Sequence, residues 1–168
     1  MNPIDISKHT KNTLEFIFNE ADKMATEILK SLAENTSKSF ILVAIYSSIL
    51  SYSFFQIVDK SYLYLILLVG CSISTVILGK NLFPNKIVIK GSLPEIMIDE
   101  YFNSFSGEEL EKEYLATQIE NYNLAINQNR KTIEKMVSRF KNSIYSMLVF
   151  MLIFLVWFLL SSTESFQC

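Results

Sequence analysis

Three stretches of the chain contain no charged residue and interrupt an otherwise polar sequence. They cover residues 40–58, 62–79 and 144–160, and two serines extend the last stretch to residue 162. Each approaches the roughly 20 apolar residues that an α-helix needs to cross the hydrocarbon core of a bilayer. The pattern therefore predicts an all-α membrane protein with three transmembrane helices.

The connections between these spans predict how they are arranged. Only residues 59–61 separate the first two spans, so residues 39–79 are expected to form a transmembrane hairpin. The third span covers residues 144–162 and leaves residues 163–168 as a tail. Both spans of the hairpin carry Ser or Thr hydroxyls, which are acceptable on faces turned toward a neighbouring helix.

Basic residues are distributed unevenly around the spans. Of the 15 Lys and Arg residues, only Lys60 lies between the first two spans, and none follows the third. Short loops that carry an excess of Lys and Arg stay on the cytosolic side of a membrane. The bias predicts a cytosolic N-terminus, a cytosolic segment over residues 80–143 and an external C-terminus.

Residues 1–38 have the pattern of an amphipathic helix that leads into the first span. Its apolar residues recur at steps of three and four: Leu14, Ile17, Ala21, Met24, Ile28 and Leu32. Such a stripe forms one face of a helix and needs a partner surface. A single helix is therefore expected to run from the cytosol through the first span.

The cytosolic segment, residues 80–143, begins irregularly and ends in a long helix. Residues 86–90 read Lys-Ile-Val-Ile-Lys, and the three β-branched residues predict a short strand-like segment near the membrane surface. Residues 106–109 read Ser-Gly-Glu-Glu, which is typical of a helix start, and no Gly or Pro follows before residue 160.

The long helix carries a heptad pattern. One core position holds Ile119, Ile126, Ile133 and Phe140, and the other holds Tyr122, Asn129 and Met136. About three heptads are the minimum for a coiled coil. We expect this segment and the N-terminal stripe to pack as a cytosolic helical bundle, within one chain, between chains, or both.

Composition and motifs exclude several classes of function. The net charge is −2 and no dense basic patch occurs, which argues against a nucleic-acid polymer as partner. Two cysteines and one histidine predict neither a disulfide framework nor a metal site. Gly-rich phosphate loops and nucleophile elbows are absent. The sequence therefore predicts neither an enzyme nor a protein with a resident cofactor.

Polar residues in two places are candidates for binding a ligand. Asn127, Asn129, Arg130 and Lys131 offer amides and two cations within two helical turns, which suits a base and a phosphate. The alternatives are a solvated helix face and, for Asn129, a residue that fixes helix register. Lys86 and Lys90 could contact anionic headgroups or simply reflect the positive-inside bias.

A small-Lys-small motif at residues 36–42 leads into the first span, and a tight turn gives the second. Residues 99–101 read Asp-Glu-Tyr before the long helix, whose polar stretch at residues 123–141 approaches the last span. In these features the chain resembles the Pycsar effector family of bacterial antiphage membrane proteins. The family usually has an acidic residue shortly before the Lys, whereas this chain has residues 35–37, Asn-Thr-Ser.

The resemblance implies a function and a location. A partner cyclase makes a cyclic nucleotide on infection, the effector senses it as its activating ligand, and the integrity of the bacterial inner membrane is lost. Homo-oligomers in the lipid bilayer are expected to act in this process. The alternative is a non-catalytic membrane scaffold or assembly subunit that acts through its cytosolic coiled coil.

Overall fold

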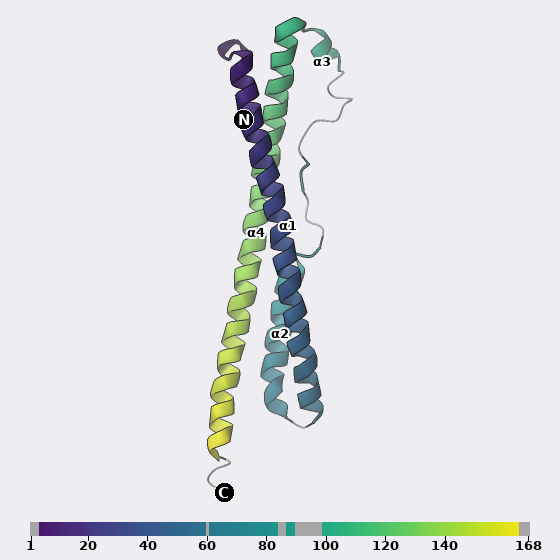
Figure 1. Cartoon of the computed structure of the whole chain (residues 1–168). Helices are drawn as coiled ribbons and strands as arrows, with labels where there is room; N and C mark the ends of the chain where they lie inside the picture. Colours follow the sequence, from purple (N-terminus) through teal and green to yellow (C-terminus); the bar gives the residue numbers. More distant parts are fainter. Residues whose placement is uncertain (1–3, 60, 84–86, 90–98, 165–168) are drawn as a thin grey trace. The chain divides into compact units, whose positions relative to one another are not determined.

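The computed structural model describes residues 4–59, 61–83, 87–89 and 99–164, and helices dominate them. The elements are η1 (Ile6–Lys8), α1 (Lys11–Val58), η2 (Tyr62–Tyr64), α2 (Leu65–Gly79), α3 (Glu100–Asn103) and α4 (Gly107–Glu164) (Figure 1). Within these described ranges the structure contains no strand. Residues 87–89 belong to the predicted strand-like segment but are not a strand, because no second strand pairs with them there.

Three helices are long and apolar enough to cross a membrane: Lys11–Val58, Tyr62–Gly79 and Gly107–Ser162. The prediction of three helices that could cross a membrane is therefore confirmed. With 48 and 58 residues, α1 and α4 are more than twice the roughly 20 residues that one span requires. Helix α4 begins at Gly107, whose φ of 60° is a left-handed conformation that glycine adopts without steric cost.

The chain divides into two compact units, and α1 and α4 contribute to both. Unit 1 comprises Met1–Leu32 and Lys86–Ile133, and unit 2 comprises Ala33–Asn85 and Glu134–Cys168. Each unit therefore contains part of the same two long helices.

In unit 1, α1 and α4 lie side by side and run in the same direction (Figure 1). Lys11 pairs with Glu111 near the start of both helices, and the Tyr122 hydroxyl lies 3.1 Å from Asp22 Oδ1 further along. The core consists of Ala25, Tyr122 and Ile126, with Phe18, Ala21 and Ile28 packed against it. The two apolar stripes therefore meet within one chain.

The buried stripe of α1 is rotated from the predicted one. Leu14 and Leu32 are buried as expected, but Ile17 and Met24 are 36% and 42% exposed. Phe18 and Ala25 pack on α4 in place of these two residues. The apolar face of α1 is wider than the surface that α4 covers, and the sequence pattern did not reveal which row would be covered.

The connection before α4 packs through aromatic residues. Asp99 caps α3, since its side chain accepts a hydrogen bond from the Glu100 amide at 2.7 Å. Phe102 is buried and stacks on Tyr114 of α4, with ring centroids 4.5 Å apart. This contact attaches α3 to unit 1.

Unit 2 packs the remaining parts of α1 and α4 with α2. Tyr46, Cys71 and Met147 form its core, one residue from each helix. Gly70 lets α2 approach α4 closely, because a Cβ placed there would lie 2.5 Å from Phe150 Cβ. The rings of Tyr64 and Phe154 lie 5.3 Å apart. The predicted hairpin is therefore packed against the third apolar helix.

Candidate functional site

Asn129 of α4 is the most constrained of the predicted ligand-binding residues. It is 2% exposed, and its side chain pairs with the backbone of Val88. The Val88 amide donates to Asn129 Oδ1 at 3.0 Å, and Asn129 Nδ2 donates to the Val88 carbonyl at 2.9 Å. These two bonds match the pairing that a neighbouring strand would provide. Asn129 therefore clamps residues 87–89 onto α4.

The other predicted residues of α4 point elsewhere. Asn127, Arg130 and Lys131 are exposed, while Asn129 is buried between them in sequence. Asn127 lines a shallow, open depression of about 350 Å³ together with Glu120, Asn121 and Leu124. Lys86 and Lys90 lie outside the described residues. The structure joins Asn129 to residue 88 but does not gather the predicted side chains around one cavity.

Charge changes sign along α4. Five acids with one base, Lys112, precede five bases with one acid, Glu134: the acids are Glu108, Glu109, Glu111, Glu113 and Glu120, and the bases are Arg130, Lys131, Lys135, Arg139 and Lys141. Near the acidic end, the hydrogen bond and charge of Glu111 raise the pKa of Lys11 above its ordinary value. Further along, burial raises the pKa of the Tyr122 phenol, and its hydrogen bond to Asp22 raises it further. Anionic ligands are therefore favoured only toward the basic end.

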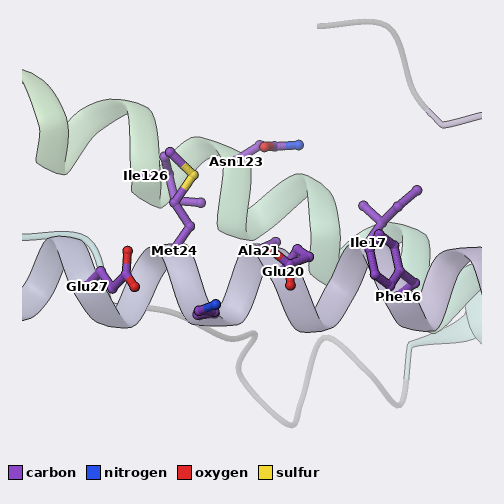
Figure 2. A pocket seen from close by; sticks show the side chains of 9 residues that line it. Phe16, Ile17, Glu20, Ala21, Met24, Glu27, Asn123 and Ile126 are labelled. Atoms are coloured by element: carbon purple, nitrogen blue, oxygen red, sulfur yellow. The ribbon is translucent and has the colours of Figure 1, made fainter.

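An open groove of about 520 Å³ lies between α1 and α4 in unit 1 (Figure 2). Its lining consists of Phe16, Ile17, Glu20, Ala21, Lys23, Met24 and Glu27 from α1, with Asn123 and Ile126 from α4. Figure 2 shows Met24 extending from α1 toward the helix that carries Ile126. Two carboxylates and one ammonium group border the apolar surface, so the groove does not favour an anion.

Unit 2 contains a set of buried hydroxyls between its helices. Ser74 of α2 and Ser143 of α4 are both fully buried. Each hydroxyl donates to the other residue's carbonyl, at 3.2 and 3.1 Å. The Tyr46 hydroxyl of α1 donates to the same Ser143 carbonyl at 3.5 Å. Three helices therefore share one polar contact.

A second buried polar contact holds the end of α2. Asn81 is 1% exposed, and its Nδ2 donates to Ser39 Oγ at 3.2 Å and to the Met136 carbonyl at 3.0 Å. Arg139 donates to the Lys80 carbonyl at 3.3 Å. Asn81 and Arg139 were not among the residues predicted from the sequence. A polar side chain shortly after the second apolar window was the signal that could have found Asn81.

No metal centre emerges from the part of the chain that the structure describes, where no group of three or more His, Cys, Asp or Glu side chains could hold an ion. The features described above are the clamp, the groove and the two buried polar contacts. No protein-family model, curated protein or solved structure matches this chain.

Proposed function

We propose that this chain is a membrane effector of a nucleotide-signalled bacterial antiphage defence system, and that it impairs inner-membrane integrity when activated. The observation that supports this most is that α1 and α4 each contribute to both compact units. A change in helix packing in unit 1 would then be imposed on the apolar helices of unit 2 through continuous helices. Such coupling requires a ligand that favours one packing arrangement over another.

The Asn129 clamp is the proposed element that changes state. Its two hydrogen bonds hold residues 87–89, which follow α2 in the chain, on α4. An anionic cyclic nucleotide bound by Arg130 and Lys131, with Asn127 contacting its base, would compete with or reinforce this clamp. Lys86 and Lys90 flank the clamped residues in sequence and would add positive charge.

The proposed orientation places unit 1 in the cytosol, where a partner cyclase would release its product. The distribution of Lys and Arg supports this orientation. The hydrogen bonds between buried Ser74 and Ser143 support the proposal that the helices of unit 2 can change their packing. Inter-helix hydrogen bonds in a membrane contribute only about 0.6 kcal/mol on average, so exchanging them costs little. Homo-oligomers in the bilayer would then disrupt the inner membrane.

The test is uptake of a membrane-impermeant dye by cells that express the chain with each of a panel of nucleotide cyclases. Dye entry with one cyclase only is the expected result. Arg130→Ala/Lys131→Ala should abolish entry, whereas Lys30→Ala/Lys141→Ala, a matched loss of two exposed cations, should not. Equal entry with both double variants would exclude Arg130 and Lys131 as the sensor.

A non-catalytic scaffold is the second candidate, and one observation favours it. Phe16, Ile17 and Met24 expose apolar surface in unit 1, which is typical of a protein-binding face. A scaffold would leave the membrane intact with every cyclase while retaining a bound partner. Absence of dye entry from cells with verified membrane insertion would favour this function over the effector.

A further inference from the structure

Two basic residues meet at the polar end of unit 2, where α2 ends against α4. Helix α2 ends at Gly79, and Lys80 is its C-cap. Arg139 of α4 donates from Nη1 to the Lys80 carbonyl at 3.3 Å and to Asn81 Oδ1 at 3.5 Å. A guanidinium group has five N–H donors, so these two bonds leave donors of Arg139 for a further acceptor.

Lys80 and Arg139 form no ion pair within the part of unit 2 that the structure describes. The acidic residues at the same end of this unit are Glu34 and Glu134. Glu34 lies 4.0 Å from Lys38, on α1. Glu134 precedes Arg139 by five residues, which places it about 140° away around α4. The charge where α2 meets α4 is therefore positive.

In a bilayer that covers the three apolar windows, these basic residues would lie at the depth of the lipid headgroups. Lys80 immediately follows the window 62–79, and Arg139 and Asn142 precede the window 144–160 by five and two residues. At a rise of 1.5 Å per residue, they lie about 7.5 and 3 Å beyond the hydrocarbon. Each headgroup layer is roughly 5 to 7.5 Å thick. Asn142 is exposed and lies on the same face of α4 as Arg139, three residues later.

An apolar row on α2 leads to Lys80 from within the second apolar window. Gly70 of α2 lies against Phe150 of α4, so this side of α2 borders α4. Ile73, Ile77 and Lys80 follow Gly70 at steps of three, four and three. Residues at these steps lie on one face of a helix. Ile73 is 42% exposed and Ile77 is half-buried, so the row offers apolar surface beside α4 that ends in a cation.

We propose that the polar end of unit 2 binds one anionic phospholipid where α2 meets α4. Its phosphate would lie at Lys80, Arg139 and Asn142, since Arg and Lys donate charge-assisted hydrogen bonds to phosphate oxygens. One acyl chain would follow Ile73 and Ile77. Basic sites between membrane helices on the cytosolic side recognise anionic headgroups in this way. A zwitterionic lipid has the same chains but no net charge, so it would bind less tightly.

This inference rests on the membrane location in the proposed function, but its test needs neither a nucleotide nor dye entry. The full-length chain in detergent is titrated with phosphatidylglycerol and with phosphatidylcholine, and bound lipid is counted by native mass spectrometry. One phosphatidylglycerol should bind about 25-fold more tightly than phosphatidylcholine, at about fivefold for each of the two bases.

Substitution of the two bases should remove this preference in steps. Lys80→Gln removes the ammonium group but keeps the backbone carbonyl that Arg139 contacts, so the packing should persist while phosphatidylglycerol binds about fivefold less tightly. Lys80→Gln/Arg139→Gln should bind both lipids equally. Lys38→Gln/Lys141→Gln is the matched control, because it removes two exposed cations from the same end of unit 2. It should keep the preference.

Three outcomes of the titration would overturn the proposal. Equal losses in Lys80→Gln/Arg139→Gln and in the control would mean a general attraction between cations and the membrane surface. An unchanged preference in Lys80→Gln would mean that the headgroup lies elsewhere. Displacement of phosphatidylglycerol by an equal concentration of glycerol 3-phosphate, which has no acyl chain, would mean a site for a soluble phosphate.

The position of the acyl chain has its own test in vesicles. Ile77→Trp is placed in a chain with Trp157→Phe, which removes the one native tryptophan. Dibrominated phosphatidylglycerol should quench its fluorescence more than dibrominated phosphatidylcholine does at the same mole fraction. Ile41→Trp, at an exposed position of α1, should be quenched equally by both lipids. Equal quenching of Ile77→Trp would overturn the proposal.

The outcomes separate this site from the proposed function. Selective quenching of Ile77→Trp without dye entry under any cyclase would retain the lipid site and reject the effector function. Dye entry with one cyclase and equal quenching would do the reverse. A chain that does not float with vesicles would reject the membrane location on which both depend.

Discussion

The buried faces of α1 differ in chemistry between the two units, although the same seven-residue spacing runs through both. Every seventh residue of α1 from residue 25 to residue 53 is buried. In unit 1 these residues are Ala25 and Leu32, and in unit 2 they are Ser39, Tyr46 and Ser53. Helix α4 buries Tyr122 and Ile126 in unit 1 and, in unit 2, Ser143 between the apolar Met136 and Met147. On α1 the seven-residue spacing is constant, whereas its buried residues change from apolar ones in unit 1 to hydroxyl-bearing ones in unit 2.

Water around unit 1 and lipid around unit 2 would explain this change. In water, burying apolar side chains drives helices together, with about 25 cal/mol for each Å² removed from solvent. In lipid, apolar surface gains nothing by leaving the hydrocarbon, and close packing of small residues and hydrogen bonds hold helices together. The outer faces follow the same logic, since Leu152, Leu155 and Leu159 of α4 are exposed in unit 2.

Substitution of Gly70 gives the largest expected loss of stability, and it affects unit 2. Gly70→Ala would place a Cβ 2.5 Å from Phe150 Cβ, so α2 and α4 must separate. We expect a loss of up to about 3 kcal/mol in unit 2, because overpacking forces backbone shifts. The measurement is unfolding of the detergent-solubilised protein by SDS.

Gly79→Ala is the matched control for Gly70→Ala, since nothing lies within 4 Å of a Cβ at Gly79. It should be neutral, or stabilising by up to about 1 kcal/mol through helix propensity. Similar losses in both variants would mean that close approach at Gly70 does not hold unit 2 together.

Asn129 is a buried polar residue in unit 1, where most buried residues are apolar, and its substitution tests the clamp. Asn129→Ala leaves the Val88 amide and carbonyl without their partner. We expect a loss of about 2 kcal/mol, the cost of unpaired polar groups, and faster hydrogen exchange at the residue 88 amide. Asn127→Ala changes an exposed amide two residues away and should cost less than about 0.5 kcal/mol. Unchanged protection at residue 88 would refute the clamp.

The sequence predicted the elements better than their contacts. Long charge-free windows predict helices that could cross a membrane, because charged side chains are costly in hydrocarbon, and all three windows lie in such helices. Five of the seven predicted heptad residues are buried, and two are only partly buried: Ile119, Tyr122, Ile126, Asn129 and Met136 in the first group, Ile133 and Phe140 in the second. Periodicity succeeds here because burial on a helix follows its geometry directly.

The sequence could not predict which polar groups would meet. Asn129 was identified as a candidate for register or ligand, but its partner is the backbone of Val88, 41 residues earlier. Backbone partners leave no signal in side-chain patterns. The same applies to Ser74 and Ser143, which bond to each other's carbonyls across 69 residues. The prediction for Lys86 and Lys90 lies outside the described residues.

Ser74→Ala should lower stability less than Gly70→Ala or Asn129→Ala does. It removes one donor to the Ser143 carbonyl, but the Tyr46 hydroxyl still donates to that carbonyl. We expect a loss of about 0.6 kcal/mol, the average for hydrogen bonds between membrane helices. Ser72→Ala is the control, since its hydroxyl bonds only within α2, to Leu68. A loss above about 2 kcal/mol would show that polar contacts, more than close packing, hold unit 2 together.

The smallest expected effect is a pH response at the N-terminal end of unit 1. Hydrogen bonds from the Ser7 and Lys8 side chains lower the pKa of Asp5 from 3.8 to about 2. A carboxyl with a lowered pKa in the folded state stabilises it above pH 3.8, and this contribution is lost as the pH falls toward 2. NMR titration of the Asp5 carboxyl should give a pKa of about 2, and Ser7→Ala should move this pKa back toward 3.8. The three apolar windows carry no acidic or basic residue, so their packing should not respond over this range. A midpoint near 3.8 in the unaltered chain would exclude the Asp5–Ser7 bond in solution.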